Sequence, residues 1–341
     1  MDGRRDKNLL LVSSASSRAR NVNNGVLRKM LAGRRVIHFD DFSPNPTDEQ
    51  VSRGAAVCEA MGEGVILSLG GGSSLDLGKL IYAAVKFAGR LWAIPTTFGT
   101  GSEVTQFATY YQNGRKKSLD TPDVIPELYV LSDSFTDQIP GTVAAQTVAD
   151  AFCQATESYW SVRSTVESRA HARSAIQTIW PIIRRGRIQA GDHQDLLRGA
   201  NLAGQAIQIT RTTGPHSLSY PVTSRFGVPH GQAVVLFLPT FVAFNANVTA
   251  DDCVDRRGFG SVRDAMRDIF EILGVRDGGE AKQLLTETFK QLGLRMSLGT
   301  LGIAEKDFKV IMEEGFTPER MGNNPRLVTE TDVQGFLMDL R

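Results

Sequence analysis

Short, continuous apolar runs dominate the first 130 residues of the chain. None of these runs alternates cleanly between apolar and polar positions, and continuous apolar strands are typical of a parallel sheet covered on both faces. Helical apolar spacing occurs between them, at residues 56–61 and 75–87. The order strand, helix, strand predicts an α/β domain. The predicted strands are residues 8–13, 36–39, 65–69, 91–94 and 128–131.

The pattern changes after Asp137, where long helical periodicities begin and convincing strands stop. Ser164 and Glu167 have the spacing of a capping box and predict a helix that runs to Ile179, with Pro181 helping to end it. We therefore predict two domains, residues 1–137 (α/β, with a parallel sheet) and 138–341 (all α), facing each other across a cleft. The other predicted helices are residues 143–159, 195–208, 262–273, 279–292 and 305–314.

The charge balance excludes several classes of function. The 341 residues include 38 Lys and Arg and 37 Asp and Glu, for a formal net charge of +1. So small a net charge argues against a protein of nucleic acid or anionic membranes. With 41% apolar and 22% charged residues, the chain has the composition of a globular protein and not of a disordered one.

The cysteines and the apolar runs indicate a compartment. Cys58, Cys153 and Cys253 are far apart, so they form neither a disulfide framework nor a thiolate zinc motif. The N-terminal apolar run is too short for a signal peptide, and no run approaches the roughly 20 apolar residues of a membrane span. We therefore expect a cytoplasmic protein.

A glycine-rich turn follows the third predicted strand. The segment GGGSSLDLGK, Gly70 to Lys79, leads directly into a helix. Glycines let the backbone approach a pyrophosphate closely, and a helix N-terminus offers free N–H groups and partial positive charge. The spacing is neither GxGxxG nor GxxxxGK[ST], so the standard dinucleotide and Walker motifs do not apply directly. The alternative is a glycine turn needed only for tight packing of strand and helix.

A second polar turn, PTTFGTGSEVT from Pro95 to Thr105, follows the next strand. Taken alone, it could be an ordinary polar loop. In a parallel sheet, however, both turns would emerge at the carboxyl edge, where ligands bind in open α/β sheets. The two turns together predict a nucleotide site.

Four polar residues in the second half have the chemistry of a metal site. Asp150 and Gln154 are four apart on one predicted helix, so both side chains leave the same face. His216 and His230 are 14 apart, and the chain must turn back to bring them together. One carboxylate, one amide oxygen and two imidazoles can hold a divalent ion with positions left open for substrate. Alternatively, each histidine is a hydrogen-bonded structural residue.

These segments, in this order, resemble the iron-containing (group III) alcohol dehydrogenase family over nearly the whole chain. The resemblance includes PNPT (Pro44 to Thr47), both turns, the Asp150 helix, PHG (Pro229 to Gly231) and NNPR (Asn323 to Arg326). It implies a nucleotide-binding α/β domain, a helical domain of the dehydroquinate synthase-like fold, and an NAD(P)-dependent alcohol or aldehyde reaction. Oligomers are common in the family, and we expect a homodimer here.

The resemblance assigns residue roles position by position. The metal aspartate of the family corresponds to Asp150 and its two later histidines to His216 and His230. Its remaining ligand, usually histidine, falls on Gln154, which is a weaker neutral ligand, so the choice among Fe²⁺, Zn²⁺ and Mn²⁺ is open. Tyr220 replaces a histidine that many members have near the nicotinamide, and it is a candidate for substrate binding or proton relay.

Gln154 and its surroundings look most like the branch that contains phosphonoacetaldehyde reductases. An anionic substrate needs a fixed cation, and Arg211, five residues before His216, is the best-placed candidate for a bidentate contact. Arg163 and Arg225 are weaker candidates. The implied reaction is the reduction of an aldehyde, such as phosphonoacetaldehyde, to a primary alcohol, or the reverse.

The resemblance also bears on the coenzyme. Many NAD-preferring members have an aspartate after the first strand, and here that position is Ser14, which permits NADPH as well as NADH; Arg18 could pair with the extra phosphate. The predicted coenzyme-binding residues are Ser14, Gly70, Gly71, Gly72, Ser73, Asp76, Thr96, Thr97, Thr100, Ser102 and Lys116.

Two other functions remain open at this point. A dehydroquinate synthase-like cyclase or lyase shares the fold, NAD and a related metal site, although both PTTFGTGSEVT and PHG fit the dehydrogenases better. A catalytically idle nucleotide-binding protein is the second alternative, because Gln154 weakens the metal site.

Overall fold

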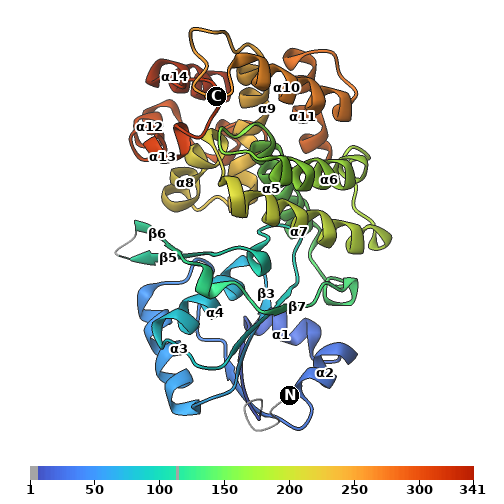
Figure 1. Cartoon of the computed structure of the whole chain (residues 1–341), viewed down its shortest axis with the longest axis vertical. Helices are drawn as coiled ribbons and strands as arrows, with labels where there is room; N and C mark the ends of the chain where they lie inside the picture. Colours follow the sequence, from blue (N-terminus) through green and yellow to red (C-terminus); the bar gives the residue numbers. More distant parts are fainter. Residues whose placement is uncertain (1–6, 113–114) are drawn as a thin grey trace. The chain divides into compact units, whose positions relative to one another are not determined.

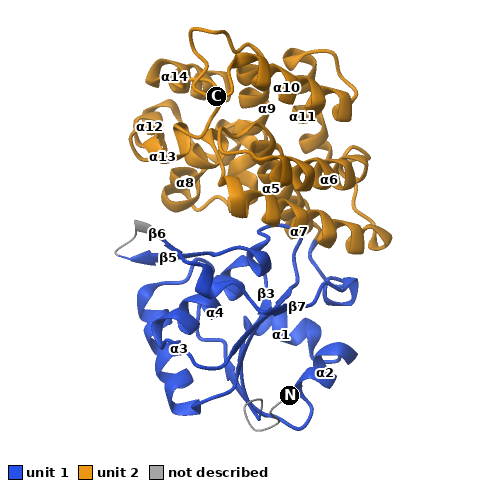
Figure 2. Cartoon of the chain, in the orientation of Figure 1, with its two compact units in different colours: residues 1–140 blue, residues 141–341 orange. Residues whose placement is uncertain are grey.

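The computed structural model describes residues 7–112 and 115–341, except for the side chains of residues 115 and 116. The chain divides into two compact units, residues 1–140 and 141–341 (Figure 2). Each unit has its own architecture and is described separately.

The first unit, at the blue end of the colour bar, contains a parallel sheet (Figure 1). The sheet has five strands in the order β2-β1-β3-β4-β7. The prediction of an α/β unit with a parallel sheet is therefore confirmed. The strands are β1 (Asn8–Val12), β2 (Arg35–Phe39), β3 (Val65–Gly70), β4 (Arg90–Pro95) and β7 (Leu128–Tyr129). The helices of this unit are α1 (Ala15–Asn21), α2 (Gly25–Leu31), α3 (Asp48–Met61) and α4 (Gly72–Ala84).

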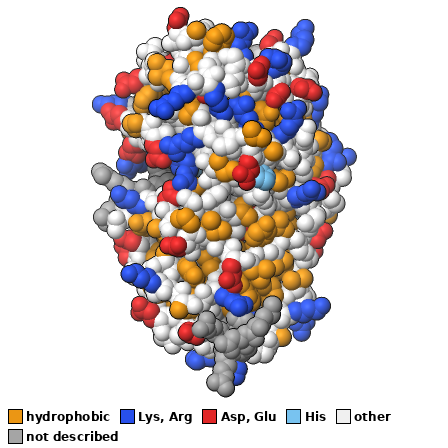
Figure 3. Space-filling view, viewed as in Figure 1, with side chains coloured by type: hydrophobic (Ala, Val, Ile, Leu, Met, Phe, Trp, Pro, Cys, Tyr) orange, Lys and Arg blue, Asp and Glu red, His pale blue; other side chains and the backbone are white. Residues whose placement is uncertain are grey.

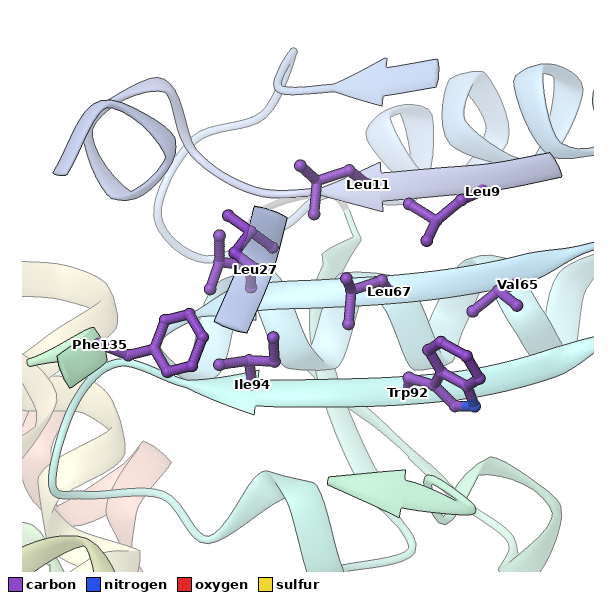
Figure 4. Packing of buried hydrophobic residues seen from close by; sticks show 9 residues of the cluster. Leu9, Leu11, Leu27, Val65, Leu67, Trp92, Ile94 and Phe135 are labelled. Carbon is purple, nitrogen blue, oxygen red and sulfur yellow. The ribbon is translucent and has the colours of Figure 1, made fainter. Parts of the chain in front are cut away.

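Apolar side chains are buried on both faces of the sheet. Figure 4 shows one face, where Leu9, Leu11 and Leu67 pack with Leu27 and Phe135. The intervening residues of the same strands pack on the opposite face in a second cluster. Successive strand residues point to opposite faces, so a strand buried on both sides must be apolar throughout. This is the physical reason for the unbroken apolar runs in the sequence.

An antiparallel pair of strands, β5 (Phe107–Gln112) and β6 (Arg115–Asp120), was not predicted from the sequence. The apolar positions of β5 (FATYYQ) are interrupted by Thr109, and β6 begins with Arg-Lys-Lys, so neither strand has the continuous apolar run by which the others were identified. A usable signal was present, because Asn113-Gly114 is a dipeptide typical of hairpin turns.

The second unit is helical, as predicted. Between residues 141 and 341, all of which are described, the only extended pairing is an isolated bridge between Cys253 and Arg326. The helices are α5 (Gly141–Trp160), α6 (Val166–Ile183), α7 (His193–Thr210), α8 (Gly214–Phe226), α9 (His230–Ala246), α10 (Phe259–Leu273), α11 (Gly278–Gln291), α12 (Phe308–Gly315), α13 (Pro318–Met321) and α14 (Glu330–Asp339).

The predicted start and end of α6 were wrong. The capping box is formed by Thr165 and Ser168, one residue after the predicted Ser164 and Glu167. Pro181 lies inside the helix, which continues to Ile183. Ser164 instead accepts hydrogen bonds from arginine side chains. The spacing of Ser164 and Glu167 therefore did not reveal that the Ser164 hydroxyl bonds to arginine side chains and not to the helix N-terminus.

Helix α9 is apolar on nearly all sides and buried along most of its length. It packs against α5, α8 and α11, so it lies inside the helical unit. No helix among the described residues is both long and apolar enough to cross a membrane. Figure 3 shows acidic and basic side chains interspersed over the visible face, in keeping with the small net charge.

Candidate metal centre and coenzyme loops

Three of the predicted metal ligands lie together in the helical unit. Asp150 is on α5, His216 is in the first turn of α8, and His230 is the first residue of α9. One potential ligand atom from each lies within 4.8 Å of the others. His216 Nε2 is 3.3 Å and His230 Nε2 is 4.0 Å from Asp150 Oδ1. Asp150 and His216 are buried, whereas the His230 side chain is 33% exposed, so the cluster is accessible from one side.

A glycine allows this convergence of helices. A Cβ atom on Gly231 would lie 1.9 Å from the backbone oxygen of Gln146 on α5, which is far inside van der Waals contact. Only a residue without a side chain therefore lets the first turn of α9 approach α5 so closely. This contact places His230 next to Asp150, four residues after Gln146 on the same helix.

The side chain of Gln154 is buried one turn after Asp150. The Gln154 Oε1 atom has no hydrogen-bond partner among the described residues. Leaving a buried acceptor unsatisfied costs about 1–3 kcal/mol. A cation would satisfy this oxygen, and the donor set of carboxylate, amide and two imidazoles fits a divalent metal.

Sequence reasoning missed Glu157, which is fully buried beside this cluster. One of its carboxylate oxygens faces His216 Nδ1. The other accepts hydrogen bonds from the backbone N–H of Thr213 (2.7 Å) and from its hydroxyl (3.0 Å). A carboxylate on the far nitrogen of a metal-binding histidine fixes its tautomer and ring orientation. The signal was in the sequence: Asp150, Gln154 and Glu157 have the i, i+4, i+7 spacing that places side chains on one face of a helix.

The carboxylates control the charge of His216. Burial by itself would lower the pKa of the imidazole, but Glu157 and Asp150 on either side outweigh burial and raise the pKa to about 10. Burial likewise opposes ionisation of Asp150, yet the hydrogen bond and charge of the two histidines bring its pKa below the ordinary value. The anionic form of Asp150 is therefore favoured, and its charge attracts a cation.

Tyr220 and Arg211, the predicted catalytic and substrate-binding residues, flank His216 in the sequence. The Tyr220 ring stacks on His230, with ring centroids 6.1 Å apart. Tyr220 is partly buried and lies one turn after His216 on α8. Arg211 is the C-cap of α7, in the short loop that leads into α8, and its side chain is partly buried.

The two predicted coenzyme loops lie against each other in the first unit. Gly70 pairs with Pro95 at the carboxyl ends of β3 and β4. Cβ atoms placed on Gly71 and Gly72 would lie 3.2 and 2.7 Å from the methyl groups of Thr97 and Thr100, respectively. The N-cap residue of α4, Gly71, has no side-chain hydrogen bond to the helix. The helix N-terminus, which favours anions, therefore lies beside a hydroxyl-rich loop.

Other residues of these loops have structural partners. Asp76 accepts hydrogen bonds from the hydroxyl of Ser102 (2.6 Å) and from the backbone N–H of Thr109 (2.9 Å). Lys79 is fully buried and donates to the carbonyl oxygens of Thr105 (2.6 Å) and Phe107 (2.9 Å). Thus Asp76 and Lys79 connect α4 to the second loop and β5. Ser73 Oγ accepts from the backbone of Asn45, and Thr96 is buried, its N–H bonded to the Gly70 carbonyl.

Ser14 is the N-cap of α1, where its hydroxyl accepts a hydrogen bond from the N–H of Ser17 (3.2 Å). Nearby, Arg18 forms a 2.8 Å ion pair with Asp40. A cavity of about 470 Å³ lies beside these elements, and its lining includes Arg18, Arg28 and His38. Lys116 was also predicted to bind coenzyme, but its side chain lies outside what the structure describes.

The sequence is similar to several known proteins. The family model "Iron-containing alcohol dehydrogenase" matches residues 2–133, and "Fe-containing alcohol dehydrogenase family, C-terminal" matches residues 144–340. Phosphonoacetaldehyde reductase of Streptomyces viridochromogenes is 32% identical over 284 residues, covering 80% of this chain and 71% of that protein. The 4-hydroxybutyrate dehydrogenase of Cupriavidus necator is 27% identical over 90% of this chain and 85% of that protein.

Solved structures share the whole fold. An iron-containing alcohol dehydrogenase from Thermococcus thioreducens superposes with a TM-score of 0.87 at 20% identity, covering 98% of this chain and 92% of that one.

Proposed function

Because the chain belongs to the iron-containing alcohol dehydrogenase family and is therefore an oxidoreductase, we propose that it reduces a small anionic aldehyde to a primary alcohol with NADPH. The reverse oxidation uses the same groups. The best-supported substrate is phosphonoacetaldehyde, with 2-hydroxyethylphosphonate as the product.

Asp150, Gln154, His216 and His230 would hold a divalent metal. The single observation that carries the proposal is the cluster of Asp150, His216 and His230 beside the unsatisfied oxygen of Gln154. When bound, Fe²⁺ or Zn²⁺ supplies a Lewis acid to the substrate oxygen. Glu157, which faces Nδ1, orients the His216 ring so that Nε2 is directed at this site. We assign the proton that the product oxygen takes up to Tyr220, and its stacking on His230 supports this role.

The coenzyme binds through its pyrophosphate at the N-terminus of α4, next to Thr97 and Thr100. The preference for NADPH rests on two features. Ser14 puts no negative charge after β1, and the adjoining cavity has Arg18, Arg28 and His38 in its lining. The ion pair of Arg18 with Asp40 has to rearrange before that guanidinium can bind a 2′-phosphate.

An anionic substrate is supported by Arg211 and by two relatives. The names of both, phosphonoacetaldehyde reductase and 4-hydroxybutyrate dehydrogenase, contain a compound with an acidic group. The guanidinium of Arg211 offers the fork of donors that matches a phosphonate or a carboxylate.

The test is an aldehyde panel. Phosphonoacetaldehyde, succinic semialdehyde and propanal are each supplied with NADPH or NADH, after metal removal and reloading with Fe²⁺, Zn²⁺ or Mn²⁺. We expect metal-dependent NADPH oxidation with the highest kcat/KM for phosphonoacetaldehyde. Equal kcat/KM values for all three aldehydes would contradict the anionic substrate. Nucleotide binding without any metal binding would instead favour an idle protein.

A further inference from the structure

The backbone of Arg211 has a conformation that suits glycine. Its φ is 63° and its ψ is 179°. Among the described residues, only Asn45 and Lys86 share a positive φ without being glycine. A positive φ combined with ψ near 180° is reached almost only by glycine, so an arginine there persists only where its surroundings impose it.

Asn323 supplies that constraint. Its side-chain amide donates to the carbonyl oxygen of Thr210 (2.8 Å) and to that of Thr212 (3.0 Å), the two carbonyls on either side of Arg211. The Asn323 amide oxygen accepts from the hydroxyl of Ser161 (2.7 Å). Asn323 is 2% exposed, so these bonds are shielded from water. One buried amide therefore bridges the carbonyls of the residues before and after Arg211 and holds the short turn that contains it.

The same loop is also attached to the metal centre. The residue after Thr212, Thr213, donates to Glu157, which in turn faces His216. The Arg211 loop is thus fixed on one side by Asn323 and on the other by Glu157. A fixed relation between a cation and the metal centre is what a substrate with an aldehyde at one end and an anion at the other requires.

We propose that Asn323 is a positioning residue for substrate specificity: it holds Arg211 in a glycine-like conformation so that the guanidinium binds the anionic group of the aldehyde. This inference rests on the proposed function, in which Arg211 contacts the substrate. Glycine would adopt the same backbone without strain, so the side chain at this position has a use that outweighs the strain.

The test uses Asn323→Asp, with Asn324→Asp as the matched control. Asn323→Asp keeps the shape and the bond from Ser161 but removes the two donated bonds. Asn324 is an equally buried neighbour whose amide pairs with Asn245 and the Arg326 carbonyl, away from Arg211. We expect Asn323→Asp to raise the KM for phosphonoacetaldehyde about tenfold or more. The KM for propanal, and the kcat for each of the two aldehydes, should stay within about twofold of the wild-type values. The control keeps the wild-type ratio of the two KM values.

Arg211→Gln separates this inference from the proposed function. A selective loss for phosphonoacetaldehyde supports Arg211 at the substrate, whereas equal losses for both aldehydes overturn that role and the inference with it. If Arg211→Gln is selective but Asn323→Asp behaves like Asn324→Asp, the proposed function stands and the positioning role is wrong. If Asn323→Asp does not fold, Ser161→Ala, which frees the amide to rotate, is the milder variant.

A readout independent of activity is the thermal stability of Arg211→Gly. Because glycine relieves the strain, we expect its melting temperature to rise by about 2–4 °C. In the Asn323→Asp background the rise should shrink, since the loop is no longer held. A fall in melting temperature for Arg211→Gly would show an unstrained arginine and overturn the inference.

Discussion

Replacing Glu157 by glutamine tests the role of the carboxylate behind His216. Glutamine fills the same space but is neutral, and it cannot accept a bond at both of its terminal atoms. In the native site one oxygen faces His216 Nδ1 and the other accepts two bonds from Thr213. The substitution therefore leaves either Thr213 without its acceptor or His216 with a donor in front of its N–H.

The magnitude follows from this geometry. Removing a partner of this kind typically weakens metal affinity 10- to 100-fold. This corresponds to about 1.4–2.8 kcal/mol of metal-binding free energy. We expect the loss in titration calorimetry of the metal-free protein with Zn²⁺, and as a changed visible spectrum of the Co²⁺ form.

Glu167→Gln is the matched control. Glu167 also lies near a histidine, His171, at 3.9 Å, but its side chain is 75% exposed and on α6. Exposed pairs of this kind contribute little, so the control should bind Zn²⁺ like wild type. Zn²⁺ affinity within twofold of wild type in Glu157→Gln would refute the reasoning.

Three further outcomes are expected. His230→Ala should keep its fold and its coenzyme binding, because the His230 side chain is partly exposed. Its turnover should fall by orders of magnitude. Normal turnover in the metal-stripped variant would reject the metal mechanism. Gly231→Ala should lower the free energy of unfolding by about 1–3 kcal/mol, because α9 must move off α5. Gly335→Ala is the control and should leave this free energy unchanged, because a Cβ there meets nothing within 4 Å. Equal denaturant midpoints for the two variants would contradict this. Burial lowers the pKa of Lys79 to about 8, so the unfolded chain binds this proton more tightly than the folded one does. The protonated lysine therefore destabilises the fold, and this destabilisation is lost as the pH rises from 8 towards 10.5. From pH 8 to 10 the wild type should gain about 2 kcal/mol of unfolding free energy relative to Lys79→Met, and a constant difference would show a normal lysine.

The sequence predicts the sheet well because its signal is local. Each parallel strand is buried on both faces, so residues such as Leu9 to Val12 are apolar without interruption. The β5–β6 pair lacks this signal, because its two strands pair with each other outside the parallel sheet and neither carries a continuous apolar run. The cap of α6 was displaced by one residue because Ser164 is used by Arg257, 93 positions later.

Residue type and family resemblance were enough to predict which residues are candidate metal ligands. They were not enough to predict the geometry of the site. His216 and His230 come together because α8 and α9 form a pair of adjoining helices, a fact that no spacing rule contains. Glu157 and Asn323 were missed for a common reason. Each acts on a residue more than 50 positions away, through a contact that exists only in the folded unit.

The central claim is that Asp150, Gln154, His216 and His230 hold one divalent cation. The most direct measurement is anomalous X-ray diffraction from crystals of the Zn²⁺-loaded protein, with data on both sides of the zinc edge. The account predicts a single strong peak about 2.0–2.2 Å from one atom of each of the four side chains, Gln154 Oε1 included. A peak at any other place in the helical unit, or one that excludes Asp150 and both histidines, would contradict it.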